Sequence, residues 1–147
     1  MTAEGWRDEL ARRQEELVRA LVGGGALPGG FNPRDVGATR DALLRKRAGE
    51  VARVWPRLAT SVGPGRWAAE FGAWAAGRPP QGSLRDGWDY ARAHPPTGAA
   101  VLELAERELL WSYDSSSAPR PRRGLGLRRV DGVFLVRFRG RIHRWSR

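Results

Sequence analysis

Few side chains in this sequence have the chemistry of a catalytic or metal-binding site. The chain has two histidines and no cysteine, which excludes disulfides, thiolate zinc sites and cysteine nucleophiles. It also lacks the HExxH and GxSxG patterns and a phosphate-binding P-loop. His94 precedes a proline at a predicted helix end, where a histidine usually interacts with the helix dipole. His143 is expected to pack, half buried, beside Trp145. The pattern favours a protein that is not an enzyme and that binds no metal or cofactor.

Two charges on predicted helices are placed for a structural role. Glu108 lies one turn after Leu104 on the last predicted helix, beside its inward stripe. Arg47 lies one turn from Leu43 and one turn from Val51 on the second helix. A guanidinium and a carboxylate that both face a core usually form a buried ion pair. We therefore predict an ion pair between Arg47 and Glu108.

The positive charge is the main candidate for a binding function. The formal net charge is +10, and the excess lies after residue 114, where Asp131 is the only acid among ten arginines. Three interpretations remain open: a solvated face that blunts sheet edges, a nucleic-acid surface, and an acidic peptide bound along a free strand edge. The predicted peptide- or partner-binding residues are Arg128, Val133, Leu135, Arg137, Arg139 and Arg141.

The first 114 residues must form the scaffold on which this basic segment is mounted. Apolar residues recur at helical spacing in five predicted helices, over residues 4–21, 32–55, 66–76, 83–93 and 97–113. Asn32-Pro33 is a strong helix start, and Pro56 is expected to kink or end the second helix. The tryptophans of the helices, including Trp6, are expected in the core. The predicted domain is a five-helix bundle-like fold.

After residue 114 the apolar period changes from 3.6 to 2. Residues 115–124 have the composition of a linker, and residues 125–147 predict a three-stranded antiparallel meander with a hairpin turn at Asp131-Gly132. The fold class is therefore mainly α with a small C-terminal β part, with domains at 1–114 and 125–147. One sheet face is expected to pack on the helices, through Leu125, Leu127, Phe134, Val136 and Phe138. The opposite face, which carries several of the arginines, is expected to face outward.

The sequence shows no targeting or membrane segment. Its first ten residues are polar and acidic, unlike a signal peptide. No apolar stretch approaches the roughly 20 residues that a membrane span requires. We expect a cytoplasmic protein with no membrane partner.

A series of short motifs runs in order through residues 10–111. They are Arg13-Gln14, Trp55-Pro56, Leu58 with Gly63, Phe71, Arg78-Pro79-Pro80, Ser83-Leu84, Gly87-Trp88, and Leu104-Ala105 with Glu108. In order and spacing they resemble the helical N-terminal domain of the HvfC/BufC/MbnC partner proteins, a family that long carried the label of a DNA-binding domain. The resemblance is to actinobacterial versions, some of them fused to, or encoded beside, a multinuclear non-haem iron oxygenase.

This resemblance implies a non-catalytic partner and peptide-recognition subunit. Such a subunit docks on the iron oxygenase and helps to present the leader of a ribosomally synthesised precursor peptide, whose cysteines the enzyme modifies. In these systems the leader can add as a strand to the β part of the partner. The alternative function is a DNA- or RNA-binding module that uses the basic C-terminal segment.

Overall fold

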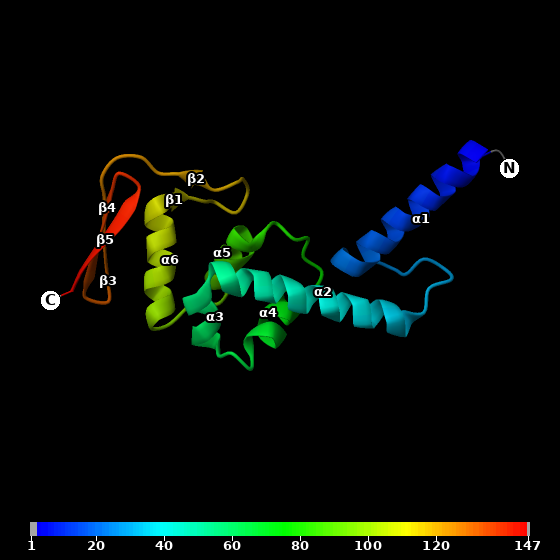
Figure 1. The fold of residues 1–147 in the computed structure, drawn as a ribbon, viewed down its shortest axis with the longest axis horizontal. Helices are drawn as coiled ribbons and strands as arrows, with labels where there is room; N and C mark the ends of the chain where they lie inside the picture. Colours follow the sequence, from blue (N-terminus) through cyan, green and yellow to red (C-terminus); the bar gives the residue numbers. More distant parts are fainter. Residues whose placement is uncertain (1–2, 147) are drawn as a thin grey trace. The chain divides into compact units, whose positions relative to one another are not determined.

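The computed structural model describes residues 3–146. Within this part of the chain six helices precede the sheet: α1 (Ala3–Gly23), α2 (Pro33–Val54), α3 (Pro56–Val62), α4 (Trp67–Ala75), α5 (Ser83–Ala93) and α6 (Ala99–Leu110) (Figure 1). The strands that follow are β1 (Trp111–Ser112), β2 (Arg120–Pro121), β3 (Gly126–Val130), β4 (Val133–Phe138) and β5 (Arg141–Ser146). The predicted class, mainly α with a small C-terminal β part, is confirmed.

Two elements differ from the expectation, and both have local causes. Pro56 has no backbone N–H for the helix ladder, so a new helix, α3, begins at this proline and the five predicted helices become six. In the predicted linker, β2 pairs antiparallel with β1, with Ser112 opposite Arg120. The segment that composition assigned to a linker is thus tied to the end of α6.

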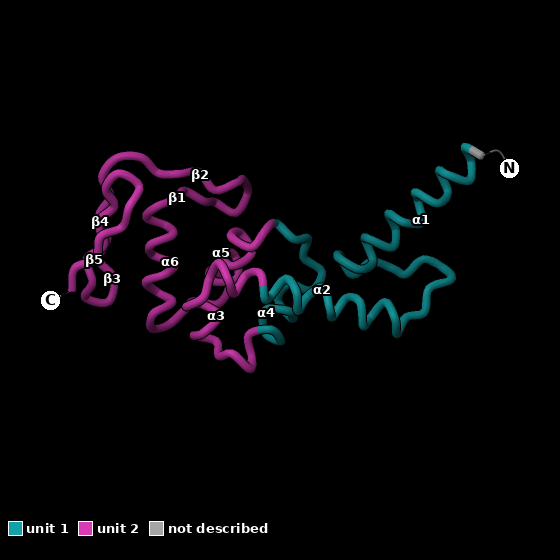
Figure 2. Tube along the Cα trace, viewed as in Figure 1, with its two compact units in different colours: residues 1–49, 68–81 teal, residues 50–67, 82–147 magenta. Residues whose placement is uncertain are grey.

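The chain divides into two compact units (Figure 2). Unit 1 comprises residues 1–49 and 68–81, and unit 2 comprises residues 50–67 and 82–147. Helices α2 and α4 contribute residues to both units. The C-terminal sheet belongs to unit 2, together with α3, α5 and α6.

Unit 1 is built on α1, most of α2 and most of α4. The carbonyl oxygen of Asn32 begins α2 by accepting from the Val36 N–H, and the Asn32 side chain accepts from the Arg34 N–H at 3.0 Å, so the predicted cap is confirmed. Arg40 donates to the carbonyl oxygen of Ala20 at 2.6 Å, which ties α2 to the last turn of α1. The guanidinium of Arg47 on α2 lies over the ring of Phe71 of α4, which is fully buried.

Helix α1 is more exposed than predicted. Trp6 is 56% exposed rather than buried, and Leu10 and Val18 on the same helix are exposed as well. Intrahelical ion pairs stabilise this helix, among them Arg13 with Glu9 at 2.9 Å. No helix among residues 3–146 is long and apolar enough to cross a membrane.

Aromatic side chains fill the core of unit 2. Trp55 and Trp88 are fully buried and meet edge to face, with ring centroids 5.9 Å apart. Trp88 also contacts Tyr113, and Trp67 contacts Tyr90 at 5.2 Å. These contacts join α3, α5 and the start of α4 around the Trp55-Pro56 break.

Helix α6 supplies hydrogen-bond partners for the backbone groups that this break leaves unpaired. Glu103, only 7% exposed, accepts a hydrogen bond of 2.8 Å from the Leu58 N–H in the first turn of α3. One turn later, Arg107 donates to the carbonyl oxygen of Val54 at the end of α2, at 2.7 Å. Its guanidinium also lies over the indole of Trp55. One face of α6 therefore caps one helix end with a carboxylate and the other with a cation, as helix dipoles favour.

Candidate functional site

The C-terminal sheet has the order β3-β4-β5, and two tight turns set its register. Asp131 and Gly132 both have positive φ, of 48° and 78°, as a type I′ hairpin requires, and Val130 pairs with Val133 across them. Arg139 and Gly140 make the second turn with φ of 50° and 76°. The predicted turns and meander are confirmed. Because side chains alternate along a strand, this register decides which residues share each face.

The face that packs on α6 is the opposite of the predicted one. Leu135 is fully buried and forms a core cluster with Ala105 and Leu109 of α6. Val130, Val133 and Ile142 pack against this cluster. The prediction that the face of Phe134 and Phe138 would be buried is therefore wrong.

Two ion pairs explain why the arginine-bearing face turns inward. Arg128 and Arg144 are the direct cross-strand neighbours of Leu135. Arg128 binds Glu108 at 2.5 Å, and Arg144 pairs with Glu106, both on α6. Arg128 and Arg144 thus bind carboxylates of α6 on either side of Leu135, which packs between the sheet and the helix.

Arg137 is the most buried charge in the sheet. It is 5% exposed, and its Nη2 donates to the carbonyl oxygen of Arg123 at 3.0 Å. The guanidinium lies against Gly126, where an added Cβ would come within 3.1 Å of Nε and 3.0 Å of Leu109. A side chain at position 126 would therefore displace Arg137. These contacts give Arg137 a structural position beneath the sheet.

The predicted binding residues are thus divided between two settings. Leu135 and Arg137 are buried and Val133 packs partly buried against the α6 cluster, so these three side chains are turned away from solvent. Arg128 stays 43% exposed and is paired with Glu108. Arg139 lies in a turn and Arg141 on the outer face opposite Phe138, and both are exposed. Periodicity alone could not choose between the two faces because each carries apolar residues and arginines.

The predicted Arg47–Glu108 ion pair is wrong in its partners. Glu108 pairs with Arg128 and lies 3.7 Å from Arg92. Arg47 donates to the carbonyl oxygens of Arg78 and Pro79, at 2.8 and 3.3 Å. The buried carboxylate of α6 is that of Glu103, which lies on a different side of the helix from Glu108.

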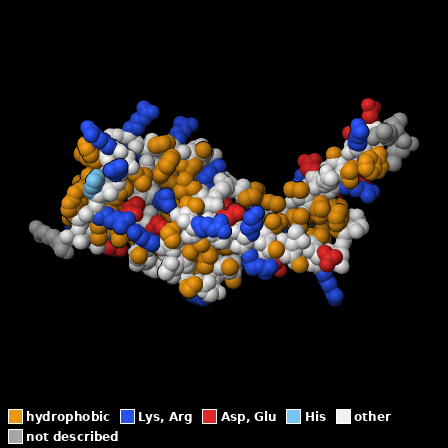
Figure 3. Space-filling model, viewed as in Figure 1, with side chains coloured by type: hydrophobic (Ala, Val, Ile, Leu, Met, Phe, Trp, Pro, Cys, Tyr) orange, Lys and Arg blue, Asp and Glu red, His pale blue; other side chains and the backbone are white. Residues whose placement is uncertain are grey.

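The outer face of the sheet is apolar and bordered by arginine. Its large side chains are exposed to 39–73%: Leu125, Leu127, Phe134, Phe138 and Trp145. Arg129 lies over the ring of Phe134 and Arg139 over the ring of Phe138, each 5.2 Å from the ring centroid. In Figure 3 hydrophobic and basic side chains are interleaved over the part of unit 2 that carries the sheet. We call the following set of residues the outer face: Leu125, Leu127, Arg129, Phe134, Val136, Phe138, Arg139, Arg141, His143 and Trp145.

The two histidines have different outcomes. His94 ends α5, where its Nδ1 lies 3.3 Å from the Tyr90 carbonyl oxygen and its ring stacks on that tyrosine, as expected of a helix end. His143 stacks beside Trp145 as predicted, at 5.8 Å, but it is exposed rather than half buried. No group of three or more histidine, aspartate and glutamate side chains among residues 3–146 is arranged to hold a metal ion.

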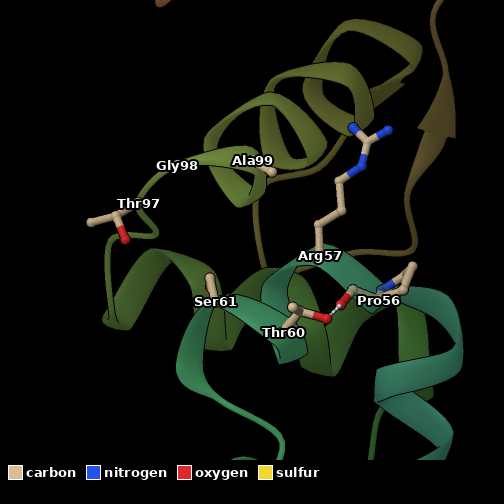
Figure 4. A pocket seen from close by; sticks show the side chains of 7 residues that line it. All are labelled: Pro56, Arg57, Thr60, Ser61, Thr97, Gly98 and Ala99. Carbon is tan, nitrogen blue, oxygen red and sulfur yellow. Dashed lines mark hydrogen bonds between the residues drawn. The ribbon is translucent and has the colours of Figure 1, made fainter.

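A cleft of about 380 Å³ lies between α3 and the start of α6 (Figure 4). Two of its hydroxyl groups have partners, since Thr60 donates to the Pro56 carbonyl oxygen and Ser61 to that of Leu58. In Figure 4 the Arg57 side chain extends toward α6, where it lies 3.7 Å from Glu106. The side chains of Thr60, Ser61 and Arg57 thus have partners within the protein.

The loop that follows β1 is organised by one carboxylate. Oδ1 of Asp114 accepts from the backbone N–H and the hydroxyl of both Ser116 and Ser117, at 2.9–3.2 Å. These hydrogen bonds lower the pKa of Asp114 from 3.8 to about 2. Close by, the hydroxyls of Tyr113 and Ser115 both donate to Asp89 of α5. Burial is the main reason that the pKa of Tyr113 is raised.

Comparison with known proteins places this fold in a family. A UPF0276 protein of Streptomyces avermitilis is 33% identical over 120 residues, which are 81% of this chain. The chain spans about a quarter of that protein's length, 24%, so most of the relative lies outside the match. The name UPF0276 and the name SCO6045-like describe no catalytic activity. No solved structure matches the chain. Residues 11–96 match the SCO6045-like C-terminal domain, and the chain therefore belongs to that family.

Proposed function

We propose that this chain is a non-catalytic partner and peptide-recognition subunit that docks on a multinuclear non-haem iron oxygenase. In this role it helps to present the leader of a ribosomally synthesised precursor peptide, whose cysteines the oxygenase modifies. The function follows from the resemblance of residues 10–111 to the HvfC/BufC/MbnC partner proteins. We further propose that the UPF0276 sequence outside the match corresponds to that oxygenase, and that the complex is cytoplasmic.

One observation carries this proposal. In the Streptomyces avermitilis relative, the region similar to this chain is part of a protein about four times as long as the matched segment. Two regions joined in one chain are held at a high effective concentration, so a contact between them needs little intrinsic affinity. We infer from this fusion that the two regions contact each other.

The test is complex formation between purified full-length proteins. The chain and the UPF0276-type protein encoded in the same genome are mixed, and their elution is compared with that of each alone. A shared peak and a Kd in the micromolar range or below are expected at about 150 mM salt. Separate elution at protein concentrations of about ten micromolar contradicts the proposal.

Leader recognition is proposed to use a free strand edge. Strands β3 and β5 are the outer strands of the three-stranded sheet, whereas β4 is central. The two-residue turns direct the N–H groups of Arg129 and Ser146 away from β4. Arg129→Pro and Ser146→Pro therefore remove an edge donor without breaking the sheet, and Arg129→Ala and Ser146→Ala are matched controls.

Loss of leader binding is expected in one of the two proline variants, each compared with its own alanine variant. Binding of a synthetic leader is measured by fluorescence anisotropy in the presence of the partner enzyme. Equal affinity in all four variants contradicts strand addition at either edge.

Nucleic-acid binding is the second candidate, and the exposed outer face is the observation that favours it. Aromatic rings beside arginines on an open sheet can bind single strands by stacking and charge. Such binding weakens steeply with salt, because each neutralised phosphate releases a counterion. A protein contact depends on salt only modestly. Salt titration of each complex therefore separates the two functions.

A further inference from the structure

The outer face concentrates exposed apolar surface in a short segment. Ten large hydrophobic side chains among residues 3–146 are exposed, and five of them lie between residues 125 and 145. Leu125 and Leu127 are 73% and 68% exposed, the two highest values among these residues. Monomeric proteins rarely leave large contiguous apolar patches uncovered, and those they leave are often functional.

The hydrogen bonds and ion pairs of the sheet leave this patch available. Leu135, Arg128 and Arg144 point to the other side, where they pack on α6 or bind its carboxylates. The contact with α6 therefore fixes the sheet in one orientation and holds the outer face outward. Cross-strand neighbours then form a continuous strip, in which Phe134 lies between Arg129 and Trp145, and Val136 between Leu127 and His143.

We propose that the outer face is the surface on which the partner enzyme docks, and that the partner contributes an apolar patch bordered by carboxylates. This inference rests on the proposed function for the identity of the partner. The apolar strip supplies the buried centre of an interface and the arginines supply its rim. The outer face carries Arg129, Arg139 and Arg141 and none of its residues is acidic, so a complementary surface carries negative charge.

The rings themselves argue for a protein partner. The guanidinium groups of Arg129 and Arg139 lie over the rings of Phe134 and Phe138. A base that stacked on the ring faces covered by these guanidinium groups would have to displace a cation–π contact. The protruding leucines have no stacking face, but they fit apolar pockets on a protein. A guanidinium held over a ring still presents N–H groups to a carboxylate.

A second copy of this chain is disfavoured by charge. Two outer faces in contact would bring Arg129, Arg139 and Arg141 of one chain against the same residues of the other. Like charges opposed across an interface are repulsive. The occupant is therefore a surface of opposite sign.

The test compares two matched double substitutions in the full chain. Leu127→Ser with Phe138→Ser removes apolar side chains from the outer face. Leu43→Ser with Phe31→Ser removes the same residue types from unit 1, where both are 42% exposed. All four side chains are solvent-exposed, so circular dichroism and Tm should show folded proteins.

Affinity for the full-length UPF0276-type protein is measured by calorimetry at about 150 mM salt. The outer-face variant should bind at least about tenfold more weakly, as expected when central interface residues are truncated. The unit 1 variant should stay within about twofold of wild type. The charge reversal Arg129→Glu with Arg139→Glu should weaken binding, and Arg45→Glu should not.

Several outcomes overturn the inference. If wild type binds the enzyme and the outer-face variant binds equally well, the inference fails and the proposed function stands. If wild type does not bind, the proposed function fails and this inference fails with it. Binding of a labelled 20-nucleotide oligothymidylate or oligouridylate that the outer-face variant loses assigns the face to nucleic acid. A dimer in light scattering that this variant dissociates assigns it to self-association.

Discussion

Arg128 on β3 and Glu108 on α6 are joined by an ion pair of 2.5 Å that fixes the orientation of the C-terminal sheet. Both residues are partly exposed, to 43% and 26% of their side chains. The pair is therefore not a deep core contact. Its effect is geometric, because together with the Arg144–Glu106 pair it aligns Leu135 with α6.

A double-mutant cycle on Arg128→Ala and Glu108→Ala measures this pair. We expect a coupling free energy of about 0.5–1 kcal/mol, since exposed pairs are weak and this one is half screened by solvent. The Arg13–Glu9 pair of α1 is the control, and its coupling should be smaller because that pair is solvent-exposed. Chemical denaturation gives the free energies of unfolding. A coupling of zero for Arg128 and Glu108 would show that apolar packing alone orients the sheet.

Gly87 is expected to be intolerant of any side chain. A Cβ at this position would lie 2.2 Å from Cδ1 of Trp55, whose indole is fully buried and donates to the Leu84 carbonyl oxygen. Gly87→Ala should therefore lower the free energy of unfolding by at least about 2 kcal/mol. Gly49→Ala is the matched control, because Gly49 is also helical and has open space around its Cβ position. That substitution should be neutral or stabilise by about 0.5–1 kcal/mol. Similar effects of the two substitutions would contradict the close packing of Trp55 on α5.

Glu103 is expected to act through its hydrogen bond to the Leu58 N–H. Glu103→Ala leaves that buried donor without its acceptor and should lower the free energy of unfolding by about 1–3 kcal/mol. Glu103→Gln keeps an acceptor oxygen and should cost about half as much or less. Thermal and chemical denaturation compare the two variants. An equal loss in both would assign the effect to charge rather than to the hydrogen bond.

The loop at Asp114 should respond to acid. Because the folded-state pKa of about 2 lies below the ordinary 3.8, the ionised carboxylate is favoured by folding. Its stabilising contribution is therefore present above about pH 4 and is lost as the pH falls toward 2. An NMR titration of the Asp114 carboxyl should give a midpoint near 2. The Ser116→Ala, Ser117→Ala double variant should move that midpoint upward, and an unchanged midpoint would reject the hydroxyl contribution.

Local signals in the sequence were enough for the elements but not for their caps. Asn32 caps α2, and Asp131-Gly132 turns the first hairpin, as predicted. The N-cap residues of helices α5 and α6 are Gly82 and Gly98, which have no side chain to cap them. At the Trp55-Pro56 break, the groups that satisfy the helix ends come from α6, some fifty residues later. Such long-range partners leave no periodic signal.

The sequence by itself determined the helices, the change of period after residue 114, both hairpin turns and the pairs of residues that share a sheet face. Those features depend on neighbours a few residues apart, through sterics, backbone hydrogen bonding and alternation. Only the tertiary structure decided which face of the sheet is buried. Both faces carry apolar residues and arginines. The buried face is the one on which Leu135 packs on Ala105 and Leu109 while Arg144 and Arg128 meet the carboxylates of Glu106 and Glu108.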